Sequence, residues 1–285
     1  MRKFNFRITQ NIDNKNQEHM GQKLGQHFLK NHNILSALVS LLHPEKAIPV
    51  IEIGPGHGEL TQHLLSSGAH VTAIEKDGAM IEHLNNNFEK EIQQGQLTLI
   101  HQDVLKALPE VVAEYAGPYD IAGNIPYYIT GYILRTIGDI SHKPRHTLLV
   151  MQKEVAERVC ATKGTMNLLA ASVQVWATPR IIKHISRKSF SPPPKVDSAA
   201  LLLEAIQENS VSADIQKTYY TFIRTLFSHP RKNILNNLSL LFEKREVVRE
   251  TIEQCGLSTT LRPQHLSIDE IKELFASFHN SNILY

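Results

Sequence analysis

Residues 50–60 read VIEIGPGHGEL, and this stretch decides the fold. An apolar run, Val50–Ile53, leads into glycines at positions 54, 56 and 58, and a helical pattern begins near Leu60. Glycine at such a turn lets the backbone approach a ligand closely, and the N-terminus of the helix offers unpaired N–H groups. The spacing is GxGxG rather than the GxGxxG of pyrophosphate-binding dinucleotide folds, which disfavours a dehydrogenase. The stretch predicts a strand–turn–helix unit with a ligand at the turn.

From Val50 onwards, short apolar runs alternate with amphipathic segments. The expected strands are Val50–Ile53, Val71–Ile74, Leu97–Ile100, Tyr119–Ala122 and Thr147–Met151. The expected helices are Leu60–Ser66, Gly78–Phe88, Val104–Tyr115, Gly131–Ile137 and Glu154–Val159, and another precedes the first strand over Asn33–Leu42. This rhythm is typical of βαβ units, which form a parallel sheet with helices on both faces. Two more strands, Arg180–Ile185 and Ser198–Ala205, are expected to add an antiparallel pair.

The pattern changes to helices alone after about Ile206. Apolar repeats recur at helical spacing over Tyr219–Leu226, Ile234–Phe242 and Ile268–Phe278. We therefore expect an α/β domain over residues 23–205 and a small, all-helical domain over residues 206–285. Residues 1–22 are rich in Asn, Gln and Lys, which predicts a flexible N-terminal arm.

The composition narrows the class of protein without choosing a partner. The formal net charge of +2 and a pI near 8.4 fall short of a strongly basic nucleic-acid binder, so any such site depends on local clusters. The two cysteines are far apart, which predicts neither a disulfide framework nor a metal site. No apolar run is long enough for a signal peptide or a membrane span, so we expect a cytoplasmic protein.

Acidic residues follow the second and third expected strands. Glu75 closes the strand in VTAIEKD, where a carboxylate can accept hydrogen bonds from the ribose hydroxyls of a nucleoside. Asp103 follows the next strand and can receive the amine of an adenine ring, although Asp before a helix is equally a good N-cap. Because open α/β sheets bind ligands at this edge, the two acids and the glycine turn predict a nucleoside cofactor. S-adenosylmethionine fits better than NAD because nothing here is arranged for a pyrophosphate.

The fourth expected strand ends in GNIPYYIT, residues 123–130. Pro126 restricts Ile125, so Asn124–Tyr127 is expected to form a short rigid loop. The side-chain oxygen of Asn124 and the carbonyl of Ile125 are two acceptors that can hold one NH₂ group, and Tyr127 offers a flat face to a base swung out of its stack. The alternative is a plain turn between strand and helix.

The chain resembles the ribosomal RNA adenine dimethyltransferases of the small-subunit type. Five stretches carry the resemblance, which runs from about residue 25 to residue 266: GQHFL at 25–29, IGPGHGEL at 53–60, GNIPYYIT at 123–130, QKEVAERV at 152–159 and FSPPPKVDSA at 190–199. The last two distinguish this group from the macrolide-resistance methylases of large-subunit RNA.

The resemblance implies a Rossmann-like class I methyltransferase sheet of seven strands, the last one antiparallel. It implies an enzyme that uses S-adenosyl-L-methionine to make dimethyladenosine from two adjacent adenines near the 3' end of small-subunit RNA. The expected partner is the pre-small-subunit particle, and the expected state is a monomer. The cofactor would be bound by His27, Leu29, Gly54, Gly56, Glu75, Asp103 and Asn124. Phe190 would stack on the target base opposite Tyr127; plain core packing is its alternative.

Three positions depart from the family pattern. His27 stands where the family has Asn, and we hypothesise that its imidazole serves as the hydrogen-bond donor instead. Lys163–Asn167 replaces a Tyr-Gly-x-Leu-Ser motif, and Pro230 replaces one basic residue of the helical domain.

Positive charge gathers locally around Phe190 and in the expected helical domain. The residues expected to contact RNA phosphates are Lys183, Arg187, Lys188, Lys195, Arg224, Arg231 and Lys232. Any single exposed lysine is more often plain solvated surface. Three other functions remain open: a large-subunit methylase that confers antibiotic resistance, a non-catalytic assembly or nucleic-acid-binding factor, and a small-molecule methyltransferase.

Overall fold

The computed structural model describes residues 27–42, 48–206, 215–242 and 244–280. The arm predicted over residues 1–22 lies outside them.

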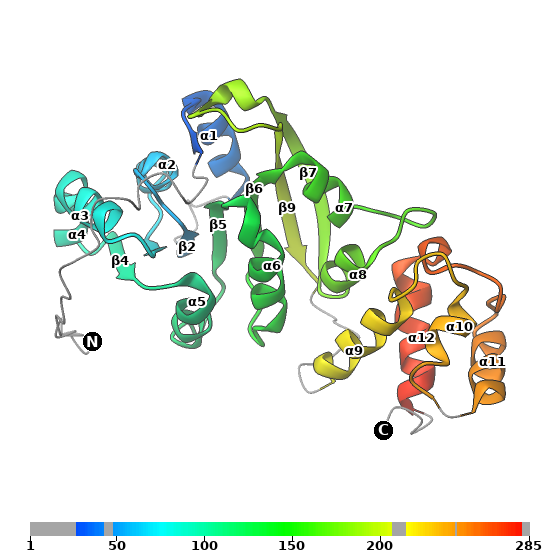
Figure 1. Cartoon of the computed structure of the whole chain (residues 1–285). Coiled ribbons are helices and arrows are strands. Elements are labelled where there is room, and N and C mark those ends of the chain that lie inside the picture. The colour runs from blue at the N-terminus through cyan, green and yellow to red at the C-terminus, as the bar shows by residue number, and fades with distance from the viewer. Residues whose placement is uncertain (1–26, 43–47, 207–214, 243, 281–285) are drawn as a thin grey trace, which may run out of the picture.

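The strands form a seven-stranded sheet and a two-stranded ribbon (Figure 1). The sheet has the order β4-β3-β2-β5-β6-β9-β7, in which β9 alone runs in the direction opposite to the other strands. This confirms the predicted seven-stranded sheet and its antiparallel last pair. The strands are β1 (Phe28–Leu29), β2 (Val50–Ile53), β3 (Val71–Glu75), β4 (Leu97–His101), β5 (Asp120–Asn124), β6 (His146–Gln152), β7 (Ala177–Ile185), β8 (Phe190–Ser191) and β9 (Ser198–Ala205).

Helices cover both faces of the sheet, and helices alone follow β9 among the described residues. Those of the α/β part are α1 (His32–Val39), α2 (Glu59–Ser66), α3 (Gly78–Asn87), α4 (Glu89–Gln93), α5 (Val104–Ala113), α6 (Thr130–Asp139), α7 (Lys153–Val159) and α8 (Leu168–Gln174). The later ones are α9 (Gln216–Leu226), α10 (Ile234–Leu238), α11 (Arg245–Gln254) and α12 (Ile268–Asn280). Short 3-10 turns lie at Ser40–Leu42, Tyr127–Ile129, Arg187–Ser189 and Pro263–His265.

Several helices differ from expectation. α4, α8 and α11 were not predicted, because the first two are short and α11 is dominated by charged residues. α10 ends at Leu238 rather than at Phe242. The Asn124–Tyr127 segment is not a loop throughout, since Asn124 still belongs to β5 and Tyr127 begins a 3-10 turn.

Alternating strand residues divide the core between the two faces of the sheet. Along the strands, every second side chain packs with α1, α2 and α3 in the first core. The side chains between them point to the other face and pack with α5, α6, α7 and α8 in the second core. Val50 belongs to the first core, whereas Ile51 and Ile53 belong to the second. Glu52 therefore points towards α2 with Val50, as the period of two in a strand requires.

The second core extends into the helices after β9. Trp176, Tyr219, Phe222 and Phe275 are buried in one hydrophobic cluster with the sheet residues. The domain boundary near Ile206 stays a prediction.

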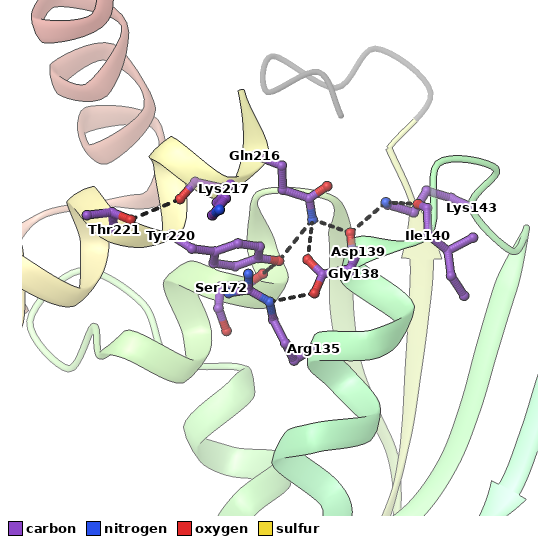
Figure 2. A network of polar contacts seen from close by, with 10 residues as sticks. All are labelled: Arg135, Gly138, Asp139, Ile140, Lys143, Ser172, Gln216, Lys217, Tyr220 and Thr221. Atoms are coloured by element: carbon purple, nitrogen blue, oxygen red, sulfur yellow. Dashed lines mark hydrogen bonds and ion pairs between the residues drawn. The ribbon is translucent and has the colours of Figure 1, made fainter. Parts of the chain in front are cut away.

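A polar network joins the end of α6 to the start of α9 (Figure 2). The Nε2 of Gln216 donates to the carbonyl of Gly138, which also accepts from Lys143 Nζ at 2.7 Å. The guanidinium of Arg135 lies 3.1 Å from the ring centroid of Tyr220. Burial lowers the pKa of Lys143 to about 8. Gly138 has no room for a side chain, since an added Cβ would lie 2.7 Å from the Tyr220 hydroxyl.

None of the described helices is long and apolar enough to cross a membrane.

A buried ion pair stabilises the sheet at the N-terminal end of β5. Asp120 is 1% exposed and accepts from Arg145 Nε at 3.1 Å, from Arg145 Nη2 at 2.6 Å and from the backbone N–H of His146 at 3.0 Å. Both carboxylate oxygens are therefore engaged.

We expect Asp120→Asn to lower the free energy of unfolding by about 2 kcal/mol, because a charged hydrogen bond contributes about 1.5–3 kcal/mol and Arg145, which is 26% exposed, loses its counter-charge. Urea denaturation measures this loss. The matched control is Glu246→Gln, which breaks an exposed pair with Arg249 and should change stability by less than about 1 kcal/mol. Equal losses in the two variants would contradict the structural role of Asp120.

Candidate functional site

A pocket opens at the carboxyl edge of the sheet, where β2, β3 and β5 end. It brings together nine residues that the sequence predicted for the site: His27, Leu29, Gly54, Gly56, Glu75, Asn124, Ile125, Pro126 and Tyr127. The predicted residues Asp103 and Phe190 do not line it. β2, β3 and β5 are neighbours in the parallel part of the sheet, so their carboxyl ends meet at one edge.

The glycine turn after β2 forms one wall of the pocket. Gly54, Gly56 and Gly58 all have positive φ, at 65°, 58° and 90°, a region that other residues rarely adopt. A Cβ at Gly56 would lie 2.6 Å from the ring of Phe28, and one at Gly58 would lie 2.5 Å from the ring of Phe88. Conformation and space both require glycine at these two positions.

Glu75 is held by backbone N–H groups at the end of β3. It is 6% exposed, and its Oε1 accepts from the N–H groups of Lys76 and Asp77 at 2.8 and 2.9 Å. Its Oε2 accepts from Gly56 at 3.2 Å. These bonds use three of the roughly four acceptor positions of a carboxylate. The remaining position on Oε2 is open to one ribose hydroxyl, and a second hydroxyl would have to displace the Gly56 N–H.

Asp103 performs the structural role that competed with its predicted cofactor role. Its Oδ1 caps α5 by accepting from the N–H of Leu105 at 3.0 Å, and its Oδ2 pairs with Lys76 Nζ at 2.9 Å. The hydrogen bond from Lys76, followed by the one from Leu105, lowers the pKa of this carboxyl. An adenine amine would therefore compete with Lys76 for Oδ2.

The loop after β5 presents two backbone-anchored acceptors. Asn124 Nδ2 donates to the carbonyl of His27 at 2.7 Å, and because a carbonyl only accepts, this contact determines which end of the amide is the oxygen. Oδ1 is thereby left as the acceptor on the other side. The N–H of Ile125 donates to Val150 at 3.0 Å, while its carbonyl accepts no hydrogen bond from the residues that the structure describes.

Tyr127 lines the pocket as predicted, whereas Phe190 does not. The hydroxyl of Tyr127 is 2.7 Å from Ser198 Oγ, which fixes the ring, and partial burial raises the pKa of this phenol. Phe190 pairs with Leu29 across the β1–β8 ribbon and is 5% exposed within the first core. This position matches the core-packing alternative, and stacking of Phe190 on a base stays a prediction.

His27 faces the pocket with one nitrogen already engaged. Nδ1 lies 2.8 Å from the carbonyl of Pro192, so Nδ1 carries the proton and donates it. In the neutral ring Nε2 is then an acceptor. The hypothesis that His27 donates to the cofactor therefore requires the imidazolium form.

The predicted RNA contacts fall into two groups. Lys183, Arg187, Lys188 and Lys195 are exposed around the β7–β9 connection, where Arg187 binds the side chain of Asp197 through its N–H at 2.9 Å. Arg224, Arg231 and Lys232 are exposed on α9 and the turn after it. Of these residues, Arg187 is linked to the site, because Asp197, which it binds, interacts electrostatically with Tyr127.

Phe28, Glu52 and Glu59 line the pocket without having been predicted. Glu52 carried a signal, because it is the one acid in an otherwise apolar strand. It is 1% exposed and accepts from Thr61 Oγ1 at 2.7 Å. Burial away from water raises its pKa to about 8, and the nearby carboxylates of Glu59 and Glu75 add to this.

Within the described ranges, no group of three or more His, Cys, Asp or Glu side chains is placed to hold a metal ion.

The comparisons with known proteins agree with one another. The family model described as ribosomal RNA adenine dimethylase matches residues 17–279. The ribosomal RNA small subunit methyltransferase A of Dehalococcoides mccartyi (strain CBDB1) is 33% identical over 252 residues, which cover 88% of this chain and 86% of that protein. The protein of the same name from Levilactobacillus brevis is 35% identical over 273 residues, with 92% and 91% covered.

Two solved structures share the fold. A dimethyladenosine transferase from Plasmodium falciparum has a TM-score of 0.72 at 24% identity and covers 91% of this chain and all (100%) of that one. The 23S rRNA methyltransferase ErmE has a TM-score of 0.69 at 23% identity, with 88% and 99% covered. They support the class I methyltransferase fold with C-terminal helices.

Substitutions at Asp103 separate its two roles. Asp103→Asn keeps an N-cap acceptor for Leu105, so stability should stay within about 0.5 kcal/mol, whereas Asp103→Ala should lose about 1 kcal/mol. Both variants should bind S-adenosylmethionine about tenfold or more weakly, because a charged hydrogen bond contributes about 1.5–3 kcal/mol. Calorimetric titration and urea denaturation give the two quantities. Wild-type cofactor affinity in Asp103→Asn would leave Asp103 as a cap alone.

The pKa of Glu52 predicts a pH dependence of stability in cofactor-free protein. Between the ordinary glutamate pKa of 4.5 and about 8, the folded chain keeps a proton that the unfolded chain has released, so stability falls as pH rises through this window and levels off above it. Glu52→Gln keeps the acceptor for Thr61 but does not titrate. Its stability relative to wild type should rise by a few kcal/mol, on the order of 1.4 kcal/mol per pKa unit, between pH 5 and pH 8.5. Parallel unfolding curves for the two proteins across this range would refute the assignment.

Proposed function

The chain belongs to the ribosomal RNA adenine dimethylase family, and we propose that its substrate is the RNA of the small ribosomal subunit. The protein is an rRNA adenine dimethyltransferase that uses S-adenosylmethionine. The choice of subunit rests on the relatives named ribosomal RNA small subunit methyltransferase A. We further propose that two adjacent adenines near the 3' end are converted to dimethyladenosine on a pre-small-subunit particle, in the cytoplasm, by a monomer.

The residues of the pocket fit S-adenosylmethionine. Gly54 lines the pocket and leaves open space where a Cβ would stand, and the carboxylate of Glu75 suits the ribose hydroxyls of the cofactor. Glu75 would accept a hydrogen bond from a ribose hydroxyl. Asp103 would accept one from the adenine amine after Lys76 Nζ has been displaced from Oδ2. When bound, the cofactor supplies an electrophilic methyl group on a sulfonium.

The loop after β5 would prepare the target amine. The exocyclic nitrogen of adenine is a poor nucleophile because its lone pair is delocalised into the ring. Asn124 Oδ1 and the Ile125 carbonyl would each accept one of its hydrogens, which favours a pyramidal nitrogen with its lone pair directed at the methyl group. The nitrogen releases one proton for each methyl group that it gains. Fixed dipoles and positioning supply the acceleration, and no strong general base is needed.

The hydrogen bond from Asn124 to the His27 carbonyl is the observation that carries this proposal. It orients the amide before any substrate arrives, so the acceptor does not have to reorganise during the reaction. Tyr127, held through Ser198, would form one face of the base site. The opposite face is assigned to Phe190, which has to leave its core position to stack.

Two alternatives are less well supported. A large-subunit methylase finds support only in the fold that the chain shares with ErmE. A non-catalytic assembly factor would have no need for the pocket's pre-oriented Asn124 or for the buried Glu75.

Transfer of radiolabelled methyl groups to purified, undermethylated small subunits tests the function. Label should appear as dimethyladenosine in their RNA. Asn124→Ala should lower the rate by about a hundredfold or more, the range found when one pre-oriented polar group is removed. Asn85→Ala, at an exposed site on α3, should not. Label on large subunits instead would support the resistance methylase, and no label with intact cofactor binding would support an assembly factor.

A further inference from the structure

Two exposed tyrosines, Tyr128 and Tyr132, come directly after the loop that follows β5. Tyr128 is 63% exposed and Tyr132 is 67% exposed, although both lie within eight positions of Asn124. Tyr128 belongs to the 3-10 turn and Tyr132 to the first turn of α6. The opposite side of α6 supplies the buried residues Ile133, Leu134 and Ile137. The two rings are therefore turned away from the core.

Nothing in the described part of the chain accounts for this exposure. Neither hydroxyl makes a hydrogen bond with another described residue, and neither ring packs against another aromatic side chain there. Two large aromatic groups are thus exposed directly after the loop that carries Asn124 and Ile125. A single exposed hydrophobic side chain needs no explanation, but two large ones only four positions apart can mark a binding site.

Charge beside the rings indicates the kind of ligand. Lys76 carries a side chain that is 75% exposed, and it is close enough to the Tyr128 hydroxyl for the two to interact electrostatically. Lys76 also pairs with Asp103, the residue that caps α5. The surface therefore combines aromatic faces with a cation, as in sites that bind unpaired nucleic acid through stacking and phosphate contacts.

The size of the surface argues against a protein partner. The only other exposed large hydrophobic side chains among the described residues are those of Leu168, Val196 and Leu240, which belong to other segments. A stable protein interface needs about 800 Å² on each side, whereas a tyrosine buries at most about 150–250 Å². Two rings match one or two nucleobases.

The reaction creates a need for such a surface. An adenine can reach the loop after β5 only when it leaves its stack, and this exposes the faces of the neighbouring bases to water. Aromatic side chains next to the loop can restore that stacking and lower the cost of extrusion. We propose that Tyr128 and Tyr132 form a stacking platform for an unpaired nucleotide that flanks the target adenine in the substrate RNA. The proposal rests on the proposed function.

The test measures how tightly the full-length wild type and its variants bind a hairpin RNA that contains the two target adenines, unmethylated. S-adenosylhomocysteine is present throughout. Tyr128→Leu and Tyr132→Leu keep apolar bulk but remove the π-face, and the double variant should bind about tenfold or more weakly, in line with about 1–3 kcal/mol per stacked base. Tyr→Phe at both positions should restore most of the affinity. Leu240→Ala removes an exposed hydrophobic group elsewhere and should change nothing.

A double-mutant cycle identifies the base. RNAs with an abasic nucleotide on the 5' or the 3' side of the target pair should bind wild type more weakly. For one of these RNAs, the double Leu variant should bind no more weakly than wild type does, because the base that stacks on the platform is already missing. The KM for small subunits should rise in the Leu variants more than kcat falls.

Three outcomes would overturn the platform: RNA affinity equal to wild type in the double Leu variant, a loss of cofactor affinity in its place, or altered self-association, which would assign the rings to a second copy. Failure of the proposed function is separate. If wild type methylates large-subunit RNA, the assigned substrate is wrong, and the same variants test the platform on that RNA. If wild type binds no RNA at all, both proposals are wrong.

Discussion

The site depends on a constraint of parallel sheets: the carboxyl ends of neighbouring strands lie at one edge. Because β2, β3 and β5 are neighbours in the order of the sheet, the glycine turn, Glu75 and Asn124 meet there, and the N–H of Gly56 then donates to Glu75. The two cores then hold the strands from both sides. The parity of the strand also explains why Glu52 lies against Thr61 of α2 rather than in the second core.

The sequence predicted what depends on local pattern and on that constraint. Strands such as Val50–Ile53 and Ser198–Ala205 have the expected bounds, because each is a short and mostly apolar run. The residues gathered in the pocket were predicted from their places at strand ends and from the family resemblance. Helix α11 was missed because charged residues obscure its buried side, Val248, Thr251 and Ile252.

Contacts between distant segments could not be predicted. The hydrogen bond from Asn124 to the His27 carbonyl spans 97 positions, and the β1–β8 ribbon that carries Phe190 into the core has only two residues in each strand. The spacing of apolar residues along the sequence carries no information about such contacts between distant segments. The same holds for Lys76, whose pairing with Asp103 places a cation where the sequence suggested an open carboxylate.

The hydrophobic cluster shared by the sheet and the last helices has a consequence for synthesis of the chain. During translation the strands and α8 emerge before Tyr219, Phe222 and Phe275, so Trp176 and its neighbours wait with an uncovered apolar flank. The carbonyl of Gly138 likewise lacks one of its two donors until Gln216 appears. A nascent chain halted near residue 206 would therefore expose this flank to chaperones, and its burial has to wait until α9 and α12 have been made.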